Sequence, residues 1–330
     1  MISIALSILL VFTALAARAD LCLDWTSLRN PVLSYPDWSV KDCACEYRDG
    51  VFYLFFSAFY EDNGGIRSHV VEVTIRDFKT YSEPILNFDG EEDGWIGMCS
   101  PDITKVGNTY YLVFNSWGDK EGKLNQLFYM RSKDLVKWNT RKPLAANLTS
   151  GTRAIDAAIA FNNKKYYLFW KEKQITRCAV SSSIDGKFKF IEDGYPTFQK
   201  ANGEAVNWCE NYTLIKIDGK WRLICTIQPR PHKPCIFTMA NSGEKNSDWL
   251  TWIQGLTPEL PKQEFNSGEF ANAATLMSLQ EVDGYIYLLY AGNTEGKSYI
   301  GRGWNKLGLA RSKDLIEWIP AGMSKPWNSK

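Results

Sequence analysis

Histidine is scarce in this sequence: of 330 residues, only His69 and His232 are histidine. No CxxC pair is present, so the ligand spacing of a zinc site is missing too. The charges balance, since 38 Lys and Arg face 37 Asp and Glu and leave a formal net charge of +1. The sequence therefore offers no electrostatic basis for binding nucleic acid or an anionic membrane, and it predicts neither a metal nor a cofactor.

Long hydrophobic runs are absent after the first residues. The segment Met1–Ala19 is apolar from Ile2 to Leu15 and ends in a small-x-small pattern at Ala17–Ala19. This arrangement is typical of a signal peptide, and the run is too short for a comfortable membrane span. We expect a secreted, soluble protein that begins near Asp20, with residues 20–330 forming one domain.

The eight cysteines all follow that cleavage point, and an even number in an oxidising compartment predicts disulfides. Eight cysteines allow 105 pairings, so the sequence alone does not choose among them. One pair, Cys225 with Cys235, is expected to bridge a predicted hairpin. Asn147 and Asn211 begin sequons for N-glycosylation.

One short pattern recurs five times: a turn, an aromatic pair, then apolar residues. It reads DGVFYLFF at 49–56, GNTYYLVF at 107–114, NKKYYLFW at 163–170, DGKWRLIC at 218–225 and DGYIYLLY at 283–290. Asp-Gly and Asn-containing turns between apolar runs are typical of β-hairpins. The repeat starts are 58, 56, 55 and 65 residues apart.

A second motif follows two of these hairpins at a fixed distance. It reads RSKDLVKW at 131–138 and RSKDLIEW at 311–318, and RDFKTY at 76–81 is a weaker version. We interpret it as the end of a third strand, a turn, and an outer fourth strand. About four antiparallel strands per repeat and five repeats predict an all-β, five-bladed β-propeller, in which function is sought at the polar axis.

Acidic residues recur near the start of the innermost strand of four repeats. Asp42 lies 11 residues before Tyr53, Asp156 lies 11 before Tyr167, Glu210 lies 12 before Arg222, and Asp102 lies 9 before Tyr111. The fifth repeat has Asn272, Ala273 and Ala274 in this region.

Clustered carboxyls in a partly buried funnel raise at least one pKa, as glycoside hydrolysis requires. The competing interpretation is that these acids cap turns or pair with Lys and Arg. Recurrence at matched positions favours the catalytic interpretation.

From Val40 to Trp318 the sequence resembles family 43 glycoside hydrolases, within the wider group of five-bladed arabinanases, xylosidases, invertases and levansucrases. The resemblance is carried by the segments 41–43 with 49–50, 100–103, 154–157 and 210–212. It implies that Asp42 is the general base, Glu210 the general acid, and Asp156 the residue that orients Glu210 and keeps its pKa high. It also implies inversion of configuration, for which the two catalytic carboxyls lie about 6.5–9.5 Å apart.

The resemblance and the residue types also suggest roles for several residues around the three catalytic acids. Asp102 is expected to contact substrate or to cap a strand start, Trp95 and Trp208 are possible sugar platforms, and Glu204 is the alternative acid. Asn211 should carry no glycan if Glu210 is catalytic. Members of the family often place an axial histidine in blade five, sometimes near a calcium ion. Here that segment, 271–279, has none, and His69 and His232 are expected at the surface or in loops.

The leading expectation is a monomeric glycosidase that acts on an arabinose- or xylose-containing polysaccharide or oligosaccharide. One alternative is a retaining fructan or sucrose hydrolase, in which Asp42 would be the nucleophile and Asp156 would directly follow an Arg. Here Ile155 precedes Asp156, and Arg153 lies two positions earlier. A second alternative is a non-catalytic sugar-binding propeller, since one fold hosts unrelated functions.

Overall fold

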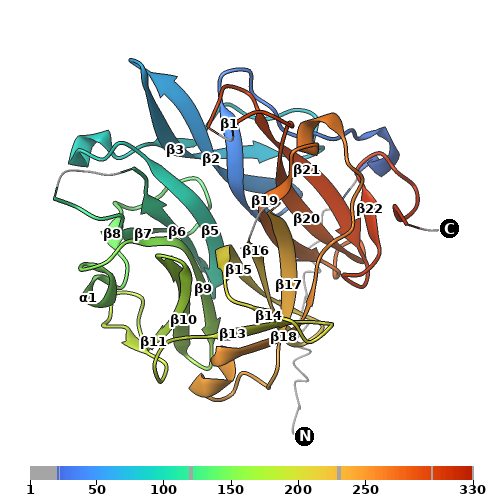
Figure 1. Ribbon diagram of the computed structural model, residues 1–330. Coiled ribbons are helices and arrows are strands. Elements are labelled where there is room, and N and C mark those ends of the chain that lie inside the picture. Colours follow the sequence, from blue (N-terminus) through green and yellow to red (C-terminus); the bar gives the residue numbers. More distant parts are fainter. Residues whose placement is uncertain (1–20, 22, 119–121, 229–231, 299, 329–330) are drawn as a thin grey trace, which may run out of the picture.

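Five sheets of mostly antiparallel strands stand like blades around a common axis (Figure 1). The computed structural model describes residues 21, 23–118, 122–228, 232–298 and 300–328, so the predicted signal peptide lies outside the described residues. The five-bladed β-propeller expected from the repeats is confirmed. No helix among the described residues is both long and apolar enough to cross a membrane.

The strands follow the chain blade by blade, with the first strand of each blade nearest the axis. Blade one contains β1 (Ser39–Arg48), β2 (Val51–Asp62), β3 (Gly65–Ile75) and β4 (Leu86–Phe88). Blade two contains β5 (Met98–Val106), β6 (Thr109–Ser116), β7 (Leu127–Ser132) and β8 (Lys142–Pro143). Blade three contains β9 (Ala154–Asn162), β10 (Lys165–Glu172), β11 (Ile175–Ser181) and β12 (Lys189–Phe190).

Blade four is larger than predicted. Its main strands are β15 (Cys209–Ile217), β16 (Lys220–Ile227), β17 (Lys233–Met239) and β18 (Thr251–Leu256). A hairpin from the preceding connection adds β13 (Thr197–Lys200) and β14 (Ala205–Val206), and β13 runs parallel to β18 at the outer edge. The sheet thus has six strands, and the added hairpin covers an edge that would otherwise be exposed.

Blade five and five short helical segments complete the fold. The blade contains β19 (Glu269–Leu279), β20 (Tyr285–Asn293), β21 (Asn305–Ser312) and β22 (Trp318–Pro320). The helical segments lie in connections and are η1 (Trp25–Ser27), η2 (Glu91–Asp93), α1 (Ala146–Thr149), η3 (Asn246–Leu250) and η4 (Glu264–Asn266).

The predicted turns form for local reasons. Between β1 and β2, Asp49 and Gly50 both have positive φ (53° and 77°), and Asp218 and Gly219 do the same between β15 and β16. Two consecutive left-handed residues give the twist that a two-residue antiparallel hairpin needs, and Asp-Gly supplies them at low cost.

The second motif also forms the predicted turn between the third and fourth strands. Asp134 Oδ1 accepts hydrogen bonds from the backbone N–H groups of Val136 (3.0 Å) and Lys137 (2.8 Å). Asp314 accepts the same pair of bonds from Ile316 and Glu317, both at 2.9 Å. These charge-assisted bonds fix the turn that leads to the outer strand.

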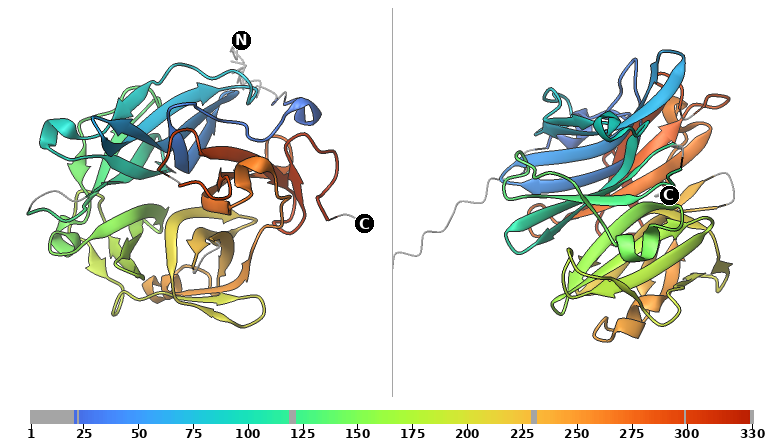
Figure 2. Two further views of the ribbon diagram at one scale, coloured as in Figure 1. Left: turned by 45° about the horizontal axis from the view of Figure 1, so that its top comes forward. Right: turned by 90° about the vertical axis from the view of Figure 1, so that its left-hand side faces the viewer.

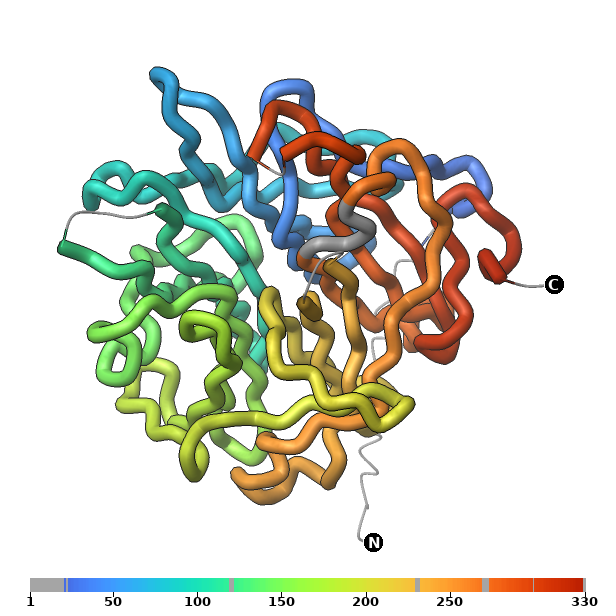
Figure 3. The backbone as a smooth tube through the Cα atoms, in the orientation of Figure 1, coloured from blue at the N-terminus to red at the C-terminus, as the bar shows by residue number. Residues whose placement is uncertain are grey.

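The ring closes through the N-terminal segment, which lies beside blade five in Figures 2 and 3. Leu33 bridges Leu307 on β21, where Val32 N–H donates to Leu307 O (2.8 Å) and Leu307 N–H donates to Leu33 O (3.0 Å). Asn30 extends this pairing with its side chain, because its Nδ2 donates to Leu309 O (3.1 Å) and its Oδ1 accepts from Leu309 N–H (2.8 Å).

The cysteines differ from the expectation. Seven of them are described and all are free and buried: Cys43, Cys45, Cys99, Cys178, Cys209, Cys225 and Cys235. The predicted disulfide between Cys225 and Cys235 is wrong, although the two residues are direct partners of β16 and β17. Directly opposed residues hold their Cβ atoms about 4.5–5.5 Å apart, whereas a disulfide needs about 3.5–4.5 Å.

Candidate active site at the propeller axis

Each innermost strand carries an irregularity where it passes the axis. The pairing register of all five shifts there, and one residue of each shift is left-handed. These residues are Asp42 (φ 51°), Ser100 (55°), Asp156 (58°), Asn211 (53°) and Ala273 (64°). Left-handed backbone is uncommon for residues other than glycine, and such strain gathers where the surrounding structure holds a site in place.

These bulges define which residues of the repeat are truly equivalent. Asp42 and Asp156 share the left-handed position, as predicted. Glu210 lies one residue before its blade's equivalent, Asn211, and Asp102 lies two residues after Ser100. The prediction that four acids occupy equivalent positions is therefore correct for Asp42 and Asp156 and wrong for Glu210 and Asp102.

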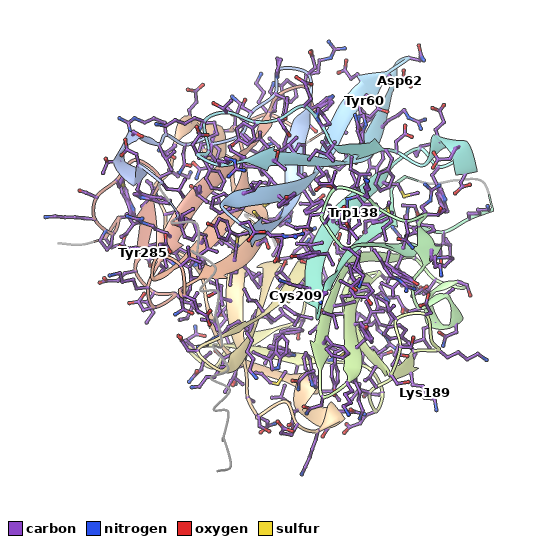
Figure 4. The ribbon with its side chains drawn as sticks, turned by 180° about the vertical axis from the view of Figure 1, so that it is seen from behind. Tyr60, Asp62, Trp138, Lys189, Cys209 and Tyr285 are labelled. Carbon is purple, nitrogen blue, oxygen red and sulfur yellow. The ribbon has the colours of Figure 1, made fainter. Side chains whose placement is uncertain are left out.

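Three of the four acids meet in one cavity of about 260 Å³ at the end of the axis where the innermost strands begin. Asp42, Asp156 and Glu210 line it from blades one, three and four. Seen from behind, Cys209, which precedes Glu210, lies near the centre of the disc, whereas Lys189 and Tyr285 lie toward its edge (Figure 4). Acids far apart in the chain are thus brought together at the axis.

Each of two acids is paired with a lysine. Lys41 Nζ lies 3.2 Å from Asp42 Oδ1, which also accepts a hydrogen bond from Asn211 Nδ2 at 3.1 Å. Lys171 on β10 forms an ion pair and hydrogen bond with Glu210 Oε2. All four charged side chains are largely buried, with 3–14% of their surface exposed. The pairs therefore lie at the floor of the cavity, where low dielectric strengthens them.

Two of the acids have opposite pKa shifts. Burial and the nearby Glu210 carboxylate raise the pKa of Asp156 to about 6, although Lys171 acts in the opposite direction. Burial also acts to raise the pKa of Glu210, but Lys171 and Lys41 outweigh it and leave that pKa below its ordinary value. The structure thus differs from the expectation that Asp156 keeps the pKa of Glu210 high.

Asp102 lies elsewhere along the axis. It is 3% exposed, and its Oδ1 accepts a hydrogen bond from Thr213 Oγ1 at 2.8 Å, while Oδ2 has no hydrogen-bond partner among the described residues. Burial raises its pKa to about 8. The described lining of the acidic cavity does not include it. Its position therefore favours a bridge between blades over a substrate contact.

One repeat position that sequence reasoning missed supports the neighbouring blade. The residue four places after the second aromatic position of the repeat is polar in four blades: Ser57, Asn115, Lys171 and Thr226. Ser57 Oγ accepts from Ser100 N–H, Asn115 Oδ1 from Asp156 N–H and Thr226 Oγ1 from Ala273 N–H, each at 2.8 Å. Lys171 instead reaches the Glu210 side chain. Each of these residues holds the bulge, or the acid beside it, in the next blade.

The aromatic wall of the cavity comes from residues that were not predicted. Trp117 and Phe59 line it, with ring centroids 5.3 Å apart in an edge-to-face pair. Phe59 belongs to the β2–β3 hairpin, whose projecting end carries Tyr60 and Asp62 (Figure 4). Neither Trp95 nor Trp208 is among the described lining residues: Trp95 is 5% exposed and packs against Phe128, and Trp208 is 46% exposed.

One of the two histidines differs from expectation. His232 lies in a loop but is buried and lines the cavity, where it acts to lower the pKa of Glu210. His69 lies on β3, half-buried between the rings of Trp38 and Tyr60. No group of three or more His, Cys, Asp or Glu in the described part of the chain is arranged to hold a metal. At the cavity, lysines pair with one carboxylate oxygen of Asp42 and one of Glu210, which disfavours a calcium ion at those oxygens.

The structure also locates Glu204 and Asn211. The alternative acid, Glu204, lies next to the outer β13–β14 hairpin and pairs with Lys200 at 2.9 Å, with 57% of its side chain exposed. It is therefore not a member of the cavity. The sequon residue Asn211 lines the cavity and donates its amide N–H to Asp42.

No protein-family model matches the sequence, and no curated protein sequence matches it either. Solved structures do match the fold. A thermostable family-43 glycoside hydrolase aligns with a TM-score of 0.60 and 16% identity, over 91% of this chain and 97% of the other. An exo-1,5-alpha-L-arabinanase from a bovine ruminal metagenomic library aligns with a TM-score of 0.56 and 16% identity, over 89% and 99%.

A third match is the GH43_1 enzyme from Xanthomonas citri in complex with xylotriose. It aligns with a TM-score of 0.59 and 14% identity, over 87% of this chain and 90% of the other. At these identities the likeness concerns the fold, and activity has to be argued from the site. The chain therefore has the five-bladed propeller fold of family-43 glycoside hydrolases.

Proposed function

We propose that this protein is a secreted glycoside hydrolase that cleaves arabinose- or xylose-containing polysaccharides or oligosaccharides with inversion of configuration. The observation that carries the proposal is the meeting of Asp42, Asp156 and Glu210 in one axial cavity. Acid–base glycoside cleavage requires two carboxyl groups at the scissile bond, one that protonates the leaving oxygen and one that activates water. The structural neighbours, an exo-arabinanase and a xylotriose-bound enzyme among them, support the sugar class.

The roles follow from the surroundings of each acid. Asp42 is held as an acceptor by Lys41 and Asn211 and acts as the base that activates water. Glu210 donates a proton to the leaving oxygen, and Asp156 positions it. Because Lys171 lowers the pKa of Glu210, proton donation by Glu210 requires that a bound sugar weaken this ion pair.

The aromatic wall supplies the binding surface. A pentose ring presents an apolar face that stacks on an aromatic ring, and Trp117 with Phe59 lies beside the acids. The cavity is closed at the axis by the bulges, so the scissile sugar enters from the open end where the innermost strands begin.

The first experiment measures reducing-sugar release on arabinan, arabinoxylan, xylan, β-galactan, inulin and sucrose. Glu210→Gln should lose about 10²- to 10⁴-fold in rate while remaining folded, because an amide cannot donate the proton. Glu204→Gln is the matched control, since this exposed glutamate lies on the same blade outside the cavity, and it should retain full activity. Equal rates for Glu210→Gln and the wild type would remove Glu210 from the mechanism.

The panel also separates the alternatives. Cleavage of inulin or sucrose with retained configuration would indicate the fructosidase chemistry, in which Asp42 is the nucleophile and the carboxyls lie about 5–5.5 Å apart. No release from any substrate by folded protein would favour a sugar-binding propeller. N-terminal sequencing of protein from the medium tests the proposed cleavage near Ala19, and sedimentation tests the proposed monomer.

A further inference from the structure

The positively charged side chains of the cavity wall differ in whether they are paired with an acid. Besides its three acids, the described part of the wall carries three side chains that are cationic at neutral pH: Lys41, Arg153 and Lys171. Lys41 pairs with Asp42 and Lys171 with Glu210, so both lysines serve the acids at the floor. Arg153 has no ion pair or hydrogen bond with any side chain within the described ranges, and its side chain is exposed. One cation of the wall is thus left for a ligand.

Arg153 is held at the rim of the cavity by its backbone neighbours. Ala154 N–H donates to Asn125 O at 3.0 Å, and Gln126 Nε2 donates to Thr152 O at 3.2 Å and to Thr149 O at 3.0 Å. The residues on both sides of Arg153 are therefore tied to blade two. Because the backbone that carries the guanidinium is already ordered, Arg153 loses less freedom on binding than an arginine on a loose loop would.

The chemistry of the group indicates its partner. A guanidinium is charged at all working pH values and presents paired N–H donors that match a planar carboxylate. Such bidentate bonds are stronger and more directional than neutral ones. Resting on the proposed hydrolase function, we propose that the cavity takes an acidic oligosaccharide, in which a uronic acid next to the cleaved pentose places its carboxylate on Arg153.

The test compares three thio-linked xylo-oligosaccharides, whose sulfur bridges resist hydrolysis, by calorimetry. One carries a glucuronic acid branch, the second has that carboxyl reduced to an alcohol, and the third carries a sulfate ester in its place. The wild type should bind the acid about 10-fold or more tightly than the reduced compound. This preference should shrink as salt is raised, since salt screens a charge at the rim.

Arg153→Gln should lose the preference while its affinity for the reduced compound changes less than about twofold. The matched control is Arg76→Gln, which removes an exposed arginine outside the cavity and should keep the preference. Equal binding of the acid and the reduced compound by the wild type would overturn the proposal, as would a preference that survives in Arg153→Gln. Tighter binding of the sulfate ester would overturn the assignment to a carboxylate.

The readout is binding, so failure of this inference can be told from failure of the proposed function. Hydrolysis of neutral pentose polymers without any Arg153-dependent preference would retain the glycosidase and reject the acidic ligand. An Arg153-dependent preference in a protein that releases no sugar would retain the acidic site and reject the glycosidase.

Discussion

Lys171 on the second strand of blade three forms an ion pair with Glu210 on the first strand of blade four. This contact joins two blades at the floor of the cavity, and against the effect of burial it lowers the pKa of the proposed acid. The lysine occupies the repeat position from which Ser57, Asn115 and Thr226 hold the bulges of their neighbours. A supporting position has thus acquired an electrostatic role.

Removing this cation should shift the pH profile. Lys171 lowers the pKa of Glu210, so Lys171→Met should raise this pKa and keep Glu210 protonated to higher pH. The alkaline limb of kcat/KM should then move upward by about one pH unit or more, whereas Lys171→Arg should keep the wild-type profile. Lys165→Met, which removes an exposed lysine from the same strand, is the control. An alkaline limb that stays in place would separate Lys171 from the titration of the acid.

Loss of the aromatic wall should weaken substrate binding more than turnover. Trp117→Ala removes a ring beside the acids, and the expected effect is a KM about 3- to 10-fold higher, in line with the strength of a stacking contact. Trp208→Ala removes an exposed ring that is not among the described lining residues and should leave KM unchanged. The opposite pattern, in which only Trp208→Ala raises KM, would place the sugar platform on Trp208.

The repeat could be read from the sequence because its signals are local. Asp-Gly turns and aromatic pairs fix the hairpins, and the distance of 11 residues to the second aromatic places both Asp42 and Asp156 on the bulge. Ser100 and Asn211 lie at the same distance from Tyr111 and Arg222, whereas Asp102 and Glu210 lie beside the bulge position, so an acidic side chain alone does not mark it.

Contacts between blades could not be read in this way. Trp117, Lys171 and His232 reach the cavity from a loop or a second strand, and their neighbours depend on how adjacent blades pack. One signal was present for Lys171, since a charged residue is unusual at the end of an apolar strand. The Cys225–Cys235 pairing failed because adjacency in a sheet was equated with disulfide geometry.

A buried acid outside the cavity should make stability depend on pH. Glu72 is fully buried, accepts a hydrogen bond from Trp138 Nε1 at 2.8 Å, and has its pKa raised by burial to about 8. A folded-state pKa above the unfolded value means that this contribution is fully present below pH 4.5 and is lost as pH rises toward 8. The loss amounts to at most about 5 kcal/mol.

Glu72→Gln should remove that dependence and raise the free energy of unfolding at alkaline pH. Urea unfolding at pH 5 and pH 8.5 measures it, and Glu83→Gln at an exposed position is the control. Parallel pH dependence in Glu72→Gln and the wild type would show that Glu72 is not the titrating group.

The side chain that extends the ring closure should contribute to stability without affecting catalysis. Asn30→Ala removes two hydrogen bonds to Leu309 and should lower the free energy of unfolding by about 1–3 kcal/mol. Asn30→Asp keeps the acceptor and loses the donor, so its free energy of unfolding should fall between those of the wild type and Asn30→Ala. Unchanged urea midpoints in both variants would mean that the pairing of Leu33 with Leu307 closes the ring unaided.

That closure has a consequence for synthesis of the protein. The segment that includes Asn30 and Leu33 leaves the ribosome early, yet its partners, Leu307 and Leu309, are among the last residues made. The first blade must therefore wait for the fifth before the circle is complete. Because the three acids come from blades one, three and four, a nascent chain carries all of them long before the ring can fix their mutual positions. We therefore expect the proposed active centre to be completed only at the end of synthesis, when the ring closes.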